Sequence, residues 1–162
     1  MTPPGAAEKV GAVPALEKTT RGNADLVDRL FTLSNRSAIG DATALSELIS
    51  SYHDDAELSS ALGLVPGDLR EDDPGPQELI RRYFDRVSRS CYLWFIYADE
   101  LQEHGDDVLA LGGIRTVDKE TRDDRERPVG WIFEIRDGRV KSAQAFPSHA
   151  DALSAIRKRD RA

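Results

Sequence analysis

The chain has 162 residues, of which 40% are hydrophobic and 31% charged, and its formal net charge is -7. This length and balance predict one soluble globular domain with tails. Because no long basic run offsets the acidic excess, a nucleic-acid-binding surface is excluded. No apolar run approaches the roughly 20 residues of a membrane span, and the N-terminus lacks the apolar core of a signal peptide. We therefore expect a cytoplasmic protein without a membrane partner.

Residues 1–22 are rich in Pro, Gly, Ala and Thr, which predicts a flexible tail. A first helix is expected with Asn23 as its N-cap. Asp41 is expected to cap a second helix, whose apolar face includes Tyr52. Residues 61–76 are acidic and rich in Pro and Gly, which is typical of a lid or a mobile connection.

A third helix is expected to begin at Pro76, because proline suits the first position of a helix. The period then changes from helical to alternating, which predicts four strands. They are expected at residues 91–105, 108–117, 129–135 and 139–146, after a shorter strand that begins near residue 53. A capping box at residues 148–151 predicts a last helix. The domain is expected to span residues 23–158, with 159–162 as a C-terminal tail.

Strands that follow helices, joined by short hairpins, indicate an α+β fold. The strongest hairpin signal is the Asp137-Gly138 turn. We expect a curved antiparallel sheet of about five strands that wraps around the N-terminal helices as a cone, whose open end suits a ligand.

Four phrases occur in an order and spacing that resembles the nuclear transport factor 2-like superfamily. Within it, the closest likeness is to the SnoaL-like (polyketide cyclase and ketosteroid isomerase-like) proteins. The phrases are "GDATALSELISSYHDDAEL", "PGPQELIRRYF", "EHGDDVLALGGIR" and "GWIFEIRDGRVKSAQAFPSHADAL". The resemblance covers about residues 24–157. It implies a cystatin-like α+β barrel and a homodimer through the outer face of the sheet, but it does not fix an activity, because the family holds both enzymes and non-enzymes.

A ketosteroid isomerase-like site needs a carboxylate base and an oxyanion hole made of a tyrosine and a protonated acid. The resemblance puts the base at Ser60, the tyrosine near Leu30 and the acid near Trp131. None of these residues has the required chemistry. Steroid isomerisation by that mechanism is therefore not expected.

Five aromatic residues are the candidates for a ligand pocket. Strand alternation puts Trp131 and Phe133 on one face, as core packing or as a pocket wall whose indole N–H can donate to a ligand. Helical spacing turns Tyr52 and Tyr83 inward, where each hydroxyl needs a partner. Trp94 completes the predicted pocket.

Asp99 and Tyr97 are the candidates for catalysis, because a carboxylate beside aromatic rings can have a raised pKa and act as a base. The alternative for Asp99 is an acid at a strand end, already in solvent. Arg115 is expected to mark where its strand leaves the core or, less simply, to bind a ligand carboxylate.

Cysteine and histidine give no sign of a metal site. Cys91 is the only cysteine, so an internal disulfide is excluded, and we expect a buried small side chain. His53, His104 and His149 lack the spacing of metal ligands. No dinucleotide-binding or phosphate-binding motif occurs, and no cofactor is expected.

Three functions remain open from the sequence. The first is binding of a small, mostly apolar molecule in the cone. The second is a cofactor-free cyclase, isomerase or dehydratase that uses acid–base chemistry there. The third is a non-catalytic dimerisation or interaction domain with a filled cone. A cavity above about 300 Å³ with two polar groups would favour binding, whereas a cone packed solid by Trp94, Trp131 and Phe133 would exclude the first two.

Overall fold

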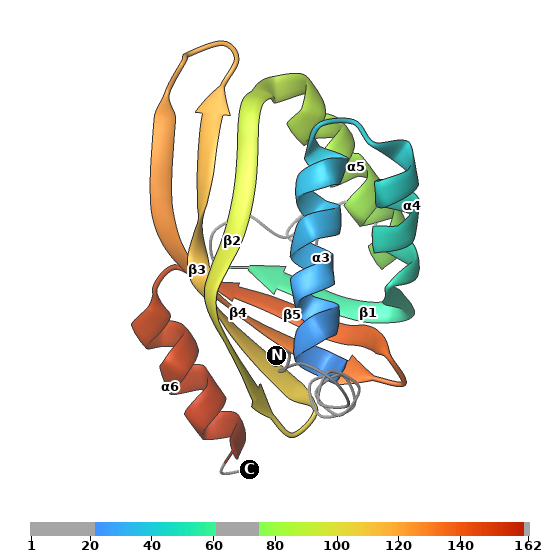
Figure 1. The fold of residues 1–162 in the computed structure, drawn as a ribbon, viewed down its shortest axis with the longest axis vertical. Coiled ribbons are helices and arrows are strands. Elements are labelled where there is room, and N and C mark those ends of the chain that lie inside the picture. Colours follow the sequence, from blue (N-terminus) through green and yellow to red (C-terminus); the bar gives the residue numbers. More distant parts are fainter. Residues whose placement is uncertain (1–21, 61–74, 161–162) are drawn as a thin grey trace, which may run out of the picture.

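The computed structural model describes residues 22–60 and 75–160 (Figure 1). The predicted N-terminal tail and almost all of the predicted lid therefore lie outside the described residues. Four helices and five strands make up the described part of the chain. They are α3 (Gly22–Ala38), α4 (Ala42–Ser50), β1 (Tyr52–Ser60), α5 (Pro76–Ser90), β2 (Cys91–His104), β3 (Asp107–Asp118), β4 (Asp124–Arg136), β5 (Arg139–Phe146) and α6 (His149–Asp160).

The five strands form one curved sheet in the order β1-β5-β4-β3-β2. The pairs β2–β3, β3–β4 and β4–β5 are antiparallel, as predicted, but β1 pairs with β5 in parallel. Tight hairpins force the first three pairs to reverse direction. No hairpin joins β1 to β5, because α5 and three strands lie between them along the chain. The α+β cone is confirmed, with a mixed rather than an all-antiparallel sheet.

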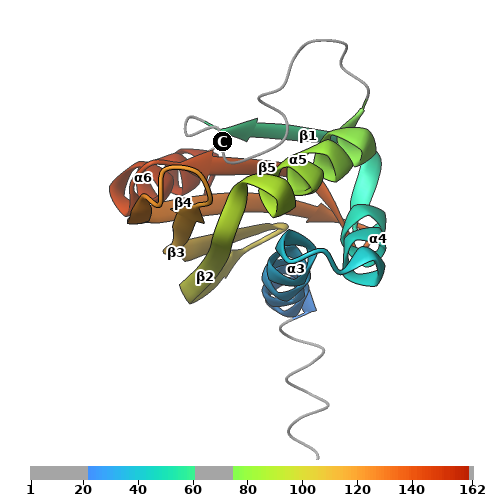
Figure 2. The same cartoon turned by 90° about the horizontal axis from the view of Figure 1, so that it is seen from above.

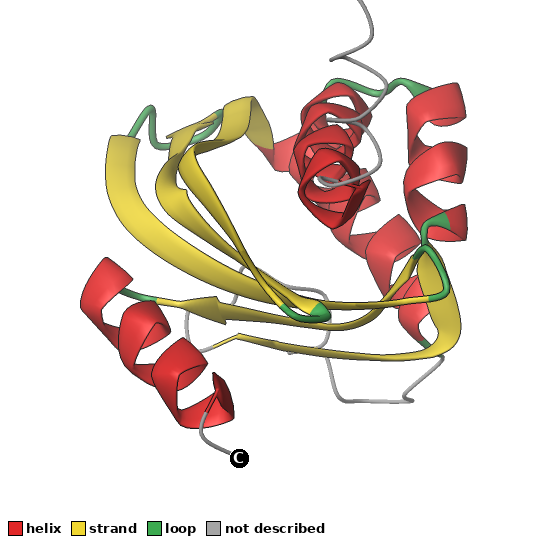
Figure 3. Cartoon of the chain, turned by 60° about the horizontal axis from the view of Figure 1, so that its bottom comes forward, coloured by secondary structure: helices red, strands yellow, loops and turns green. Residues whose placement is uncertain are grey.

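The sheet carries helices on both faces (Figures 2 and 3). Helices α3, α4 and α5 fill the concave side, and α6 crosses the opposite side. A bulge in β2 between Ala98 and Glu100 helps to bend the sheet. Gly112 lies opposite this bulge, where a Cβ atom would stand 1.8 Å from the carbonyl oxygen of Tyr97. Only glycine permits this close approach of the two backbones.

The turn between β4 and β5 has the predicted geometry. Asp137 and Gly138 have φ angles of 55° and 74°. Two successive positive φ angles are those of a type I′ turn, whose twist suits a tight hairpin. This turn fixes the register of the strand that carries Trp131, which pairs with Ala145.

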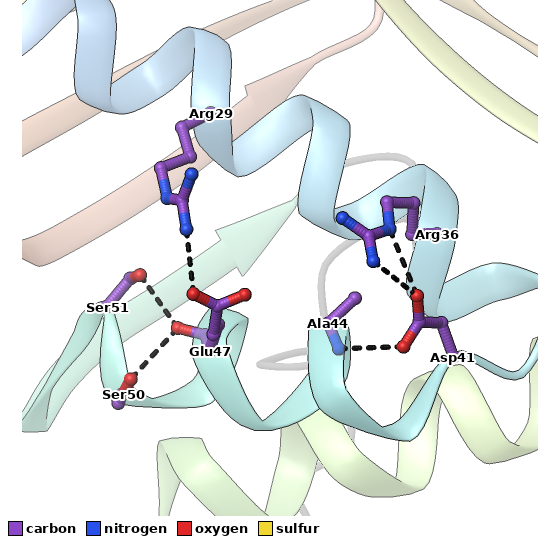
Figure 4. Close-up of polar contacts among 7 residues, drawn as sticks. All are labelled: Arg29, Arg36, Asp41, Ala44, Glu47, Ser50 and Ser51. Carbon is purple, nitrogen blue, oxygen red and sulfur yellow. Dashed lines mark hydrogen bonds and ion pairs between the residues drawn. The ribbon is translucent and has the colours of Figure 1, made fainter.

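Polar contacts join α3 to α4 (Figure 4). Asp41 caps α4 as predicted, since its Oδ1 accepts a hydrogen bond from the Ala44 N–H at 3.0 Å. That bond, followed by the Arg36 side chain, lowers the pKa of the Asp41 carboxyl. Arg29 reaches Glu47 at 2.7 Å across the two helices.

Two boundary predictions are wrong. Asn23 lies inside α3 and does not cap it. Tyr52 is the first residue of β1 and not part of α4, which ends at Ser50. The Asn23 error comes from its residue type, because asparagine favours N-caps wherever it stands near a helix start. The Tyr52 error comes from helical periodicity, which continues past the real end of a helix when the next residue on that face is also apolar.

The other helix predictions are confirmed. Helix α5 begins with Pro76 at its first position, and its buried face is the predicted one. Helix α6 starts at the predicted capping box, where Ser148 Oγ accepts a hydrogen bond from the Asp151 N–H at 3.0 Å. Among the described residues, no helix combines the length and the apolar character that crossing a membrane requires.

Helix α3 closes the cone along the free edge of β2. The Asn35 amide donates to the Ile96 carbonyl at 2.9 Å and accepts from the Ile96 N–H at 2.9 Å. This side chain therefore replaces a neighbouring strand at one residue of the sheet edge. The contact holds the inner face of β2, including Trp94 and Ile96, against the helices.

Candidate functional site

A small cavity of about 60 Å³ lies between the helices and the inner face of the sheet. Helix α3 contributes Phe31 and Ser34 to its wall, and β5 contributes Ala143. All five aromatic residues predicted for the pocket also lie in its wall: Tyr52, Tyr83, Trp94, Trp131 and Phe133. Their part in ligand binding stays a prediction, but the structure brings them together around one space.

Two aromatic clusters make up much of the wall. Tyr83, Phe84 and Trp94 contact one another edge to face, with ring centroids 5.1 to 6.1 Å apart. Phe31 contacts Trp131 at 4.8 Å and Phe133 at 6.2 Å in the same manner. Such edge-to-face pairs contribute about 0.5–1.5 kcal/mol each beyond the burial of their area.

Trp94 and Tyr83 satisfy each other in part. The Trp94 indole N–H donates to the Tyr83 hydroxyl oxygen at 3.2 Å. Burial raises the pKa of Tyr83 to about 12. At neutral pH the Tyr83 hydroxyl therefore keeps its proton and acts as a donor.

Three other polar groups in the wall have no hydrogen-bond partner among the described residues. They are the Ser34 hydroxyl, the Tyr52 hydroxyl and the Trp131 indole N–H. Ser34 is only 9% exposed and Trp131 only 6%. Most buried polar groups are hydrogen-bonded, so each exception asks for an explanation.

The backbone of Tyr52 is firmly placed although its hydroxyl has no such partner. The Arg139 guanidinium donates to the Tyr52 carbonyl, and the Gln77 amide lies 3.4 Å from the same oxygen. Residue Tyr52 as a whole is partly exposed, but burial of its phenol raises the pKa. The Tyr52 hydroxyl is thus held at the cavity in its protonated form.

The cavity is smaller than the roughly 300 Å³ that would favour ligand binding. Pockets for drug-sized ligands usually measure about 300–1,000 Å³. At about 10–15 Å³ for each water-sized probe, the space found here would admit roughly four to six waters. The side chains as they stand leave room for a compact molecule only, and a larger one would require the wall to move.

Asp99 and Tyr97 lie apart from this cavity. Asp99 is exposed and is the extra residue of the β2 bulge. The Tyr97 hydroxyl donates to Glu126 Oε2 at 2.7 Å, and this bond is the main cause that raises the Tyr97 pKa. Both residues belong to the part of β2 that faces away from the helices, and a catalytic role for them stays a prediction without support from the cavity.

The remaining polar candidates make structural contacts. Arg115 pairs with Asp124 at 2.8 Å on the surface, which agrees with a strand that leaves the core. The ring nitrogens of His53 and His149 contact backbone carbonyl oxygens at 2.7 and 2.8 Å. His104 is partly buried, and its ring nitrogens contact Gln102 and Asp160 at 3.0 Å each.

Potential metal ligands do not cluster in the described part of the chain, where no group of three His, Cys, Asp or Glu side chains converges. Cys91 is partly buried and packs at the edge of the core. Of the positions that a ketosteroid isomerase-like site would use, Leu30 and Trp131 do line the cavity. The side chain of Ser60 lies outside the described residues.

Ser34 was not among the site residues predicted from the sequence. Its spacing puts this serine on the inward stripe of the first helix, among Val27, Leu30 and Phe31. The signal was present, because a lone hydroxyl on an otherwise apolar stripe must find a partner or a cavity. The sequence could not show that the Ser34 hydroxyl has no hydrogen-bond partner among the described residues.

Comparison with known proteins adds evidence on the fold. No protein-family model matches the sequence, and no curated protein matches it. Among solved structures, 224 chains match. One is a protein with a ketosteroid isomerase-like fold from Catenulispora acidiphila, in complex with trimethylamine. It has a TM-score of 0.56 and 16% identity over 77% of this chain and 89% of its own.

The chain has the nuclear transport factor 2-like fold. SalBIII, an epoxide hydrolase/cyclase-like enzyme of pyran ring formation in the polyether salinomycin, matches with a TM-score of 0.60. Its identity is 14%, over 83% of this chain and 96% of its own. TerC, co-crystallised with polyporic acid, matches with a TM-score of 0.58 and 14% identity over 83% and 98%. At such identities the nuclear transport factor 2-like fold is shown, and function has to come from the site.

Proposed function

We propose that this protein binds a small, mostly apolar molecule inside the cone. The observation that carries the proposal is the mixed character of the cavity wall. Aromatic and aliphatic side chains dominate it, yet Ser34, Tyr52 and Trp131 offer polar groups with no partner among the described residues. An apolar wall with a few convergent polar groups is the usual composition of a ligand site.

Structural neighbours support the binding of a small molecule. Solved structures of two of them contain small organic molecules, namely trimethylamine and polyporic acid. Those molecules belong to those proteins, at 16% and 14% identity. Proteins of this fold have thus been crystallised with small organic molecules, which supports the same kind of partner for the present protein.

Thermal unfolding in the presence of a graded ligand series tests the proposal. The series runs from acetone and isobutene to terpenoid, polyketide-like and steroid compounds. A ligand that binds only the folded state raises the unfolding temperature, and above its Kd the rise keeps growing with the logarithm of the ligand concentration. We expect the compact members to do so and the steroid not to do so, because the cavity is small.

Two alanines of β5 provide a matched pair of variants. Ala143 lines the cavity, whereas Ala145 is buried on the same face but does not line it. Ala143→Val should reduce the ligand-induced rise, because its methyl groups occupy the space. Ala145→Val should leave the rise intact whatever it does to the stability of the free protein. An equal response of the two variants, or no concentration-dependent rise with any ligand, would contradict the proposal.

The cavity volume favours a second candidate function. With about 60 Å³ of space, the cone is close to filled by its own aromatic clusters. An interaction domain with a packed interior would look similar. The ligand series separates the two functions, since a protein with a filled cone would show no rise of the unfolding temperature with ligand concentration.

Acid–base catalysis has less support. The titratable side chains in the described wall are Tyr52 and Tyr83, and burial raises the pKa of both. Such tyrosines donate hydrogen bonds and do not act as bases near neutral pH. A cyclase, isomerase or dehydratase would therefore need a base from elsewhere.

We also propose a homodimer, which the family resemblance implies, through the outer face of the sheet. Helix α6 covers part of that face, so the dimer contact would use the part of β2 around Phe95. Phe95 is 45% exposed there and stacks on Tyr97. Sedimentation should show a dimer that Phe95→Lys dissociates; a monomeric wild-type protein would contradict this. The cytoplasmic location and the lack of nucleic-acid and membrane partners stay predictions.

A further inference from the structure

Two serines on α3 differ in a way that bears on the ligand. Ser34 and Ser37 are both buried. The Ser37 hydroxyl donates to the Leu33 carbonyl at 2.8 Å, as serines in helices often do. The Ser34 hydroxyl lines the cavity and has no partner among the described residues. One serine is satisfied by its own helix, and the other is available to a molecule in the cavity.

The two tryptophans repeat this contrast on the sheet. Trp94 and Trp131 both line the cavity and are both buried. The Trp94 N–H donates to Tyr83, whereas the Trp131 N–H has no acceptor in the described part of the chain. An indole N–H can only donate. A molecule that satisfies Trp131 must therefore carry a hydrogen-bond acceptor.

The lack of charged side chains in the described wall limits the charge that a ligand can carry. The residues in the described wall carry no charged side chain, and both tyrosines remain neutral donors. Burying an ion without an opposite charge costs far more free energy than burying a neutral dipole. A carboxylate would lack a cation here, and an ammonium group would leave the Trp131 N–H unsatisfied.

From these contacts we infer that the cavity selects uncharged molecules that carry an acceptor oxygen, and that Ser34 and Trp131 determine this specificity. Ketones, aldehydes, esters and ethers belong to this class. The inference rests on the proposed function and adds the ligand class to it. The volume of about 60 Å³ restricts the ligand to compact members unless the wall moves.

Three probes of one branched skeleton test the inference: acetone, acetate and isobutene. Each is titrated into the whole chain labelled with ¹⁵N, and the two tryptophan indole signals are followed. Trp131→Phe assigns the signals by removing one of them. We expect acetone to shift the Trp131 indole proton downfield with saturation in the millimolar range, which is ordinary for so small a ligand. The Trp94 signal should move less, and acetate should move neither.

Variants show whether the two residues act through hydrogen bonds. Ser34→Ala and Trp131→Phe should each weaken acetone binding by about fivefold, the scale of one hydrogen bond, and leave isobutene binding no weaker. Ser37→Ala is the matched control and should leave both affinities unchanged. Because isobutene fills the same space without an acceptor, it separates loss of the hydrogen bond from loss of shape.

The outcomes distinguish a failure of the inferred ligand class from a failure of ligand binding itself. If isobutene binds but acetone does not, or if Ser34→Ala and Trp131→Phe change both affinities alike, the ligand class is wrong while ligand binding stands. If acetate binds as well as acetone, the class is wrong for the same reason. If no probe saturates any signal, both the ligand class and the proposed function are wrong.

Discussion

The two faces of the sheet are built from the same strands but packed differently. On the outer face, α6 closes over Leu109, Leu111 and Ile132 in a compact cluster. On the inner face, the larger cluster surrounds a cavity. Neighbouring residues of β4 alternate between the two, since Ile132 faces α6 and Trp131 faces the cavity.

The size of the side chains explains the difference. Gly130 lets α6 approach so closely that a Cβ atom there would stand 2.4 Å from the Ala152 Cβ. Small and aliphatic residues pack without gaps at such a distance. The inner face carries large aromatic rings in edge-to-face contacts, which cannot fill every space between three helices and a curved sheet. A fold can thus keep one face solid for stability and leave the other open for a ligand.

The largest expected effect comes from matched truncations of the two faces. Ile132 and Ile114 are each 1% exposed, but only Ile114 lines the cavity. Ile132→Ala should cost about 3–4 kcal/mol of unfolding free energy, because it opens a new cavity in a solid layer. Ile114→Ala should cost about 2–3 kcal/mol, since part of its surface already faces space. Urea denaturation measures both, and a larger loss at Ile114 would contradict the contrast.

The close approach of α6 predicts the next effect. Gly130→Ala should lower the unfolding free energy by about 2 kcal/mol, because the added methyl group overpacks the contact with Ala152. Ala152→Gly removes the opposing methyl group and should restore much of this loss in the double variant. A double-mutant cycle without coupling would show that α6 does not sit on Gly130.

The two hydrogen bonds between Asn35 and Ile96 form the seam between α3 and the sheet edge. Their removal tests whether this seam keeps the inner face in place. Asn35→Ala removes both hydrogen bonds to Ile96 and should cost about 1.5–2 kcal/mol. Amide hydrogen exchange at Ile96 should accelerate more than that at Ile132, which lies under α6. Asn35→Asp is the conservative control, because it keeps the acceptor for the Ile96 N–H. Unchanged exchange at Ile96 in Asn35→Ala would contradict the role of this seam.

Alkaline pH gives the smallest effect, and the part of it that depends on Tyr83 reports on the inner face. The unfolded chain ionises Tyr83 near the ordinary tyrosine pKa of 10.0, but burial raises the pKa in the folded chain to about 12. Stability is therefore complete below pH 10 and falls as the pH rises from 10 to 12. At pH 11 this one group should account for about 1.4 kcal/mol of the loss.

Tyr83→Phe should reduce the loss of stability between pH 8 and pH 11 by about that amount, on the scale of one pKa unit. Comparing the two pH values within each variant removes the cost of the lost Trp94 contact. Tyr92→Phe, whose ring is 57% exposed, is the control for the loss of a phenol. If the two variants behaved alike, burial of Tyr83 in the wall would be disproved.

Local patterns in the sequence were enough for most of the fold. The face of α5, the Asp137-Gly138 turn and the caps at Asp41 and Ser148 follow from neighbouring residues alone. The parallel pairing of β1 with β5 does not, because it joins segments far apart in the chain. The contact of Asn35 with Ile96 was missed for the same reason.

The candidate site was predictable in composition but not in detail. Alternation and helical spacing brought Trp131, Phe133 and Tyr83 to one interior, where the structure has them. Asp99 was considered for its aromatic neighbours, but a bulge exposes it, and a bulge has no dependable local signature. Whether Ser34 has a partner depends on the placement of every surrounding atom, which periodicity does not describe.

Nuclear Overhauser contacts between acetone and the isoleucine methyl groups test the central claim most directly, that the inner face is open to a small molecule and the outer face is closed. Ile114 and Ile96 line the cavity, whereas Ile132 lies under α6 and Ile156 belongs to the buried face of α6. We predict contacts from the acetone methyl groups to Ile114 and Ile96 and none to Ile132 or Ile156. Contacts to all four, or to none of them, would contradict it.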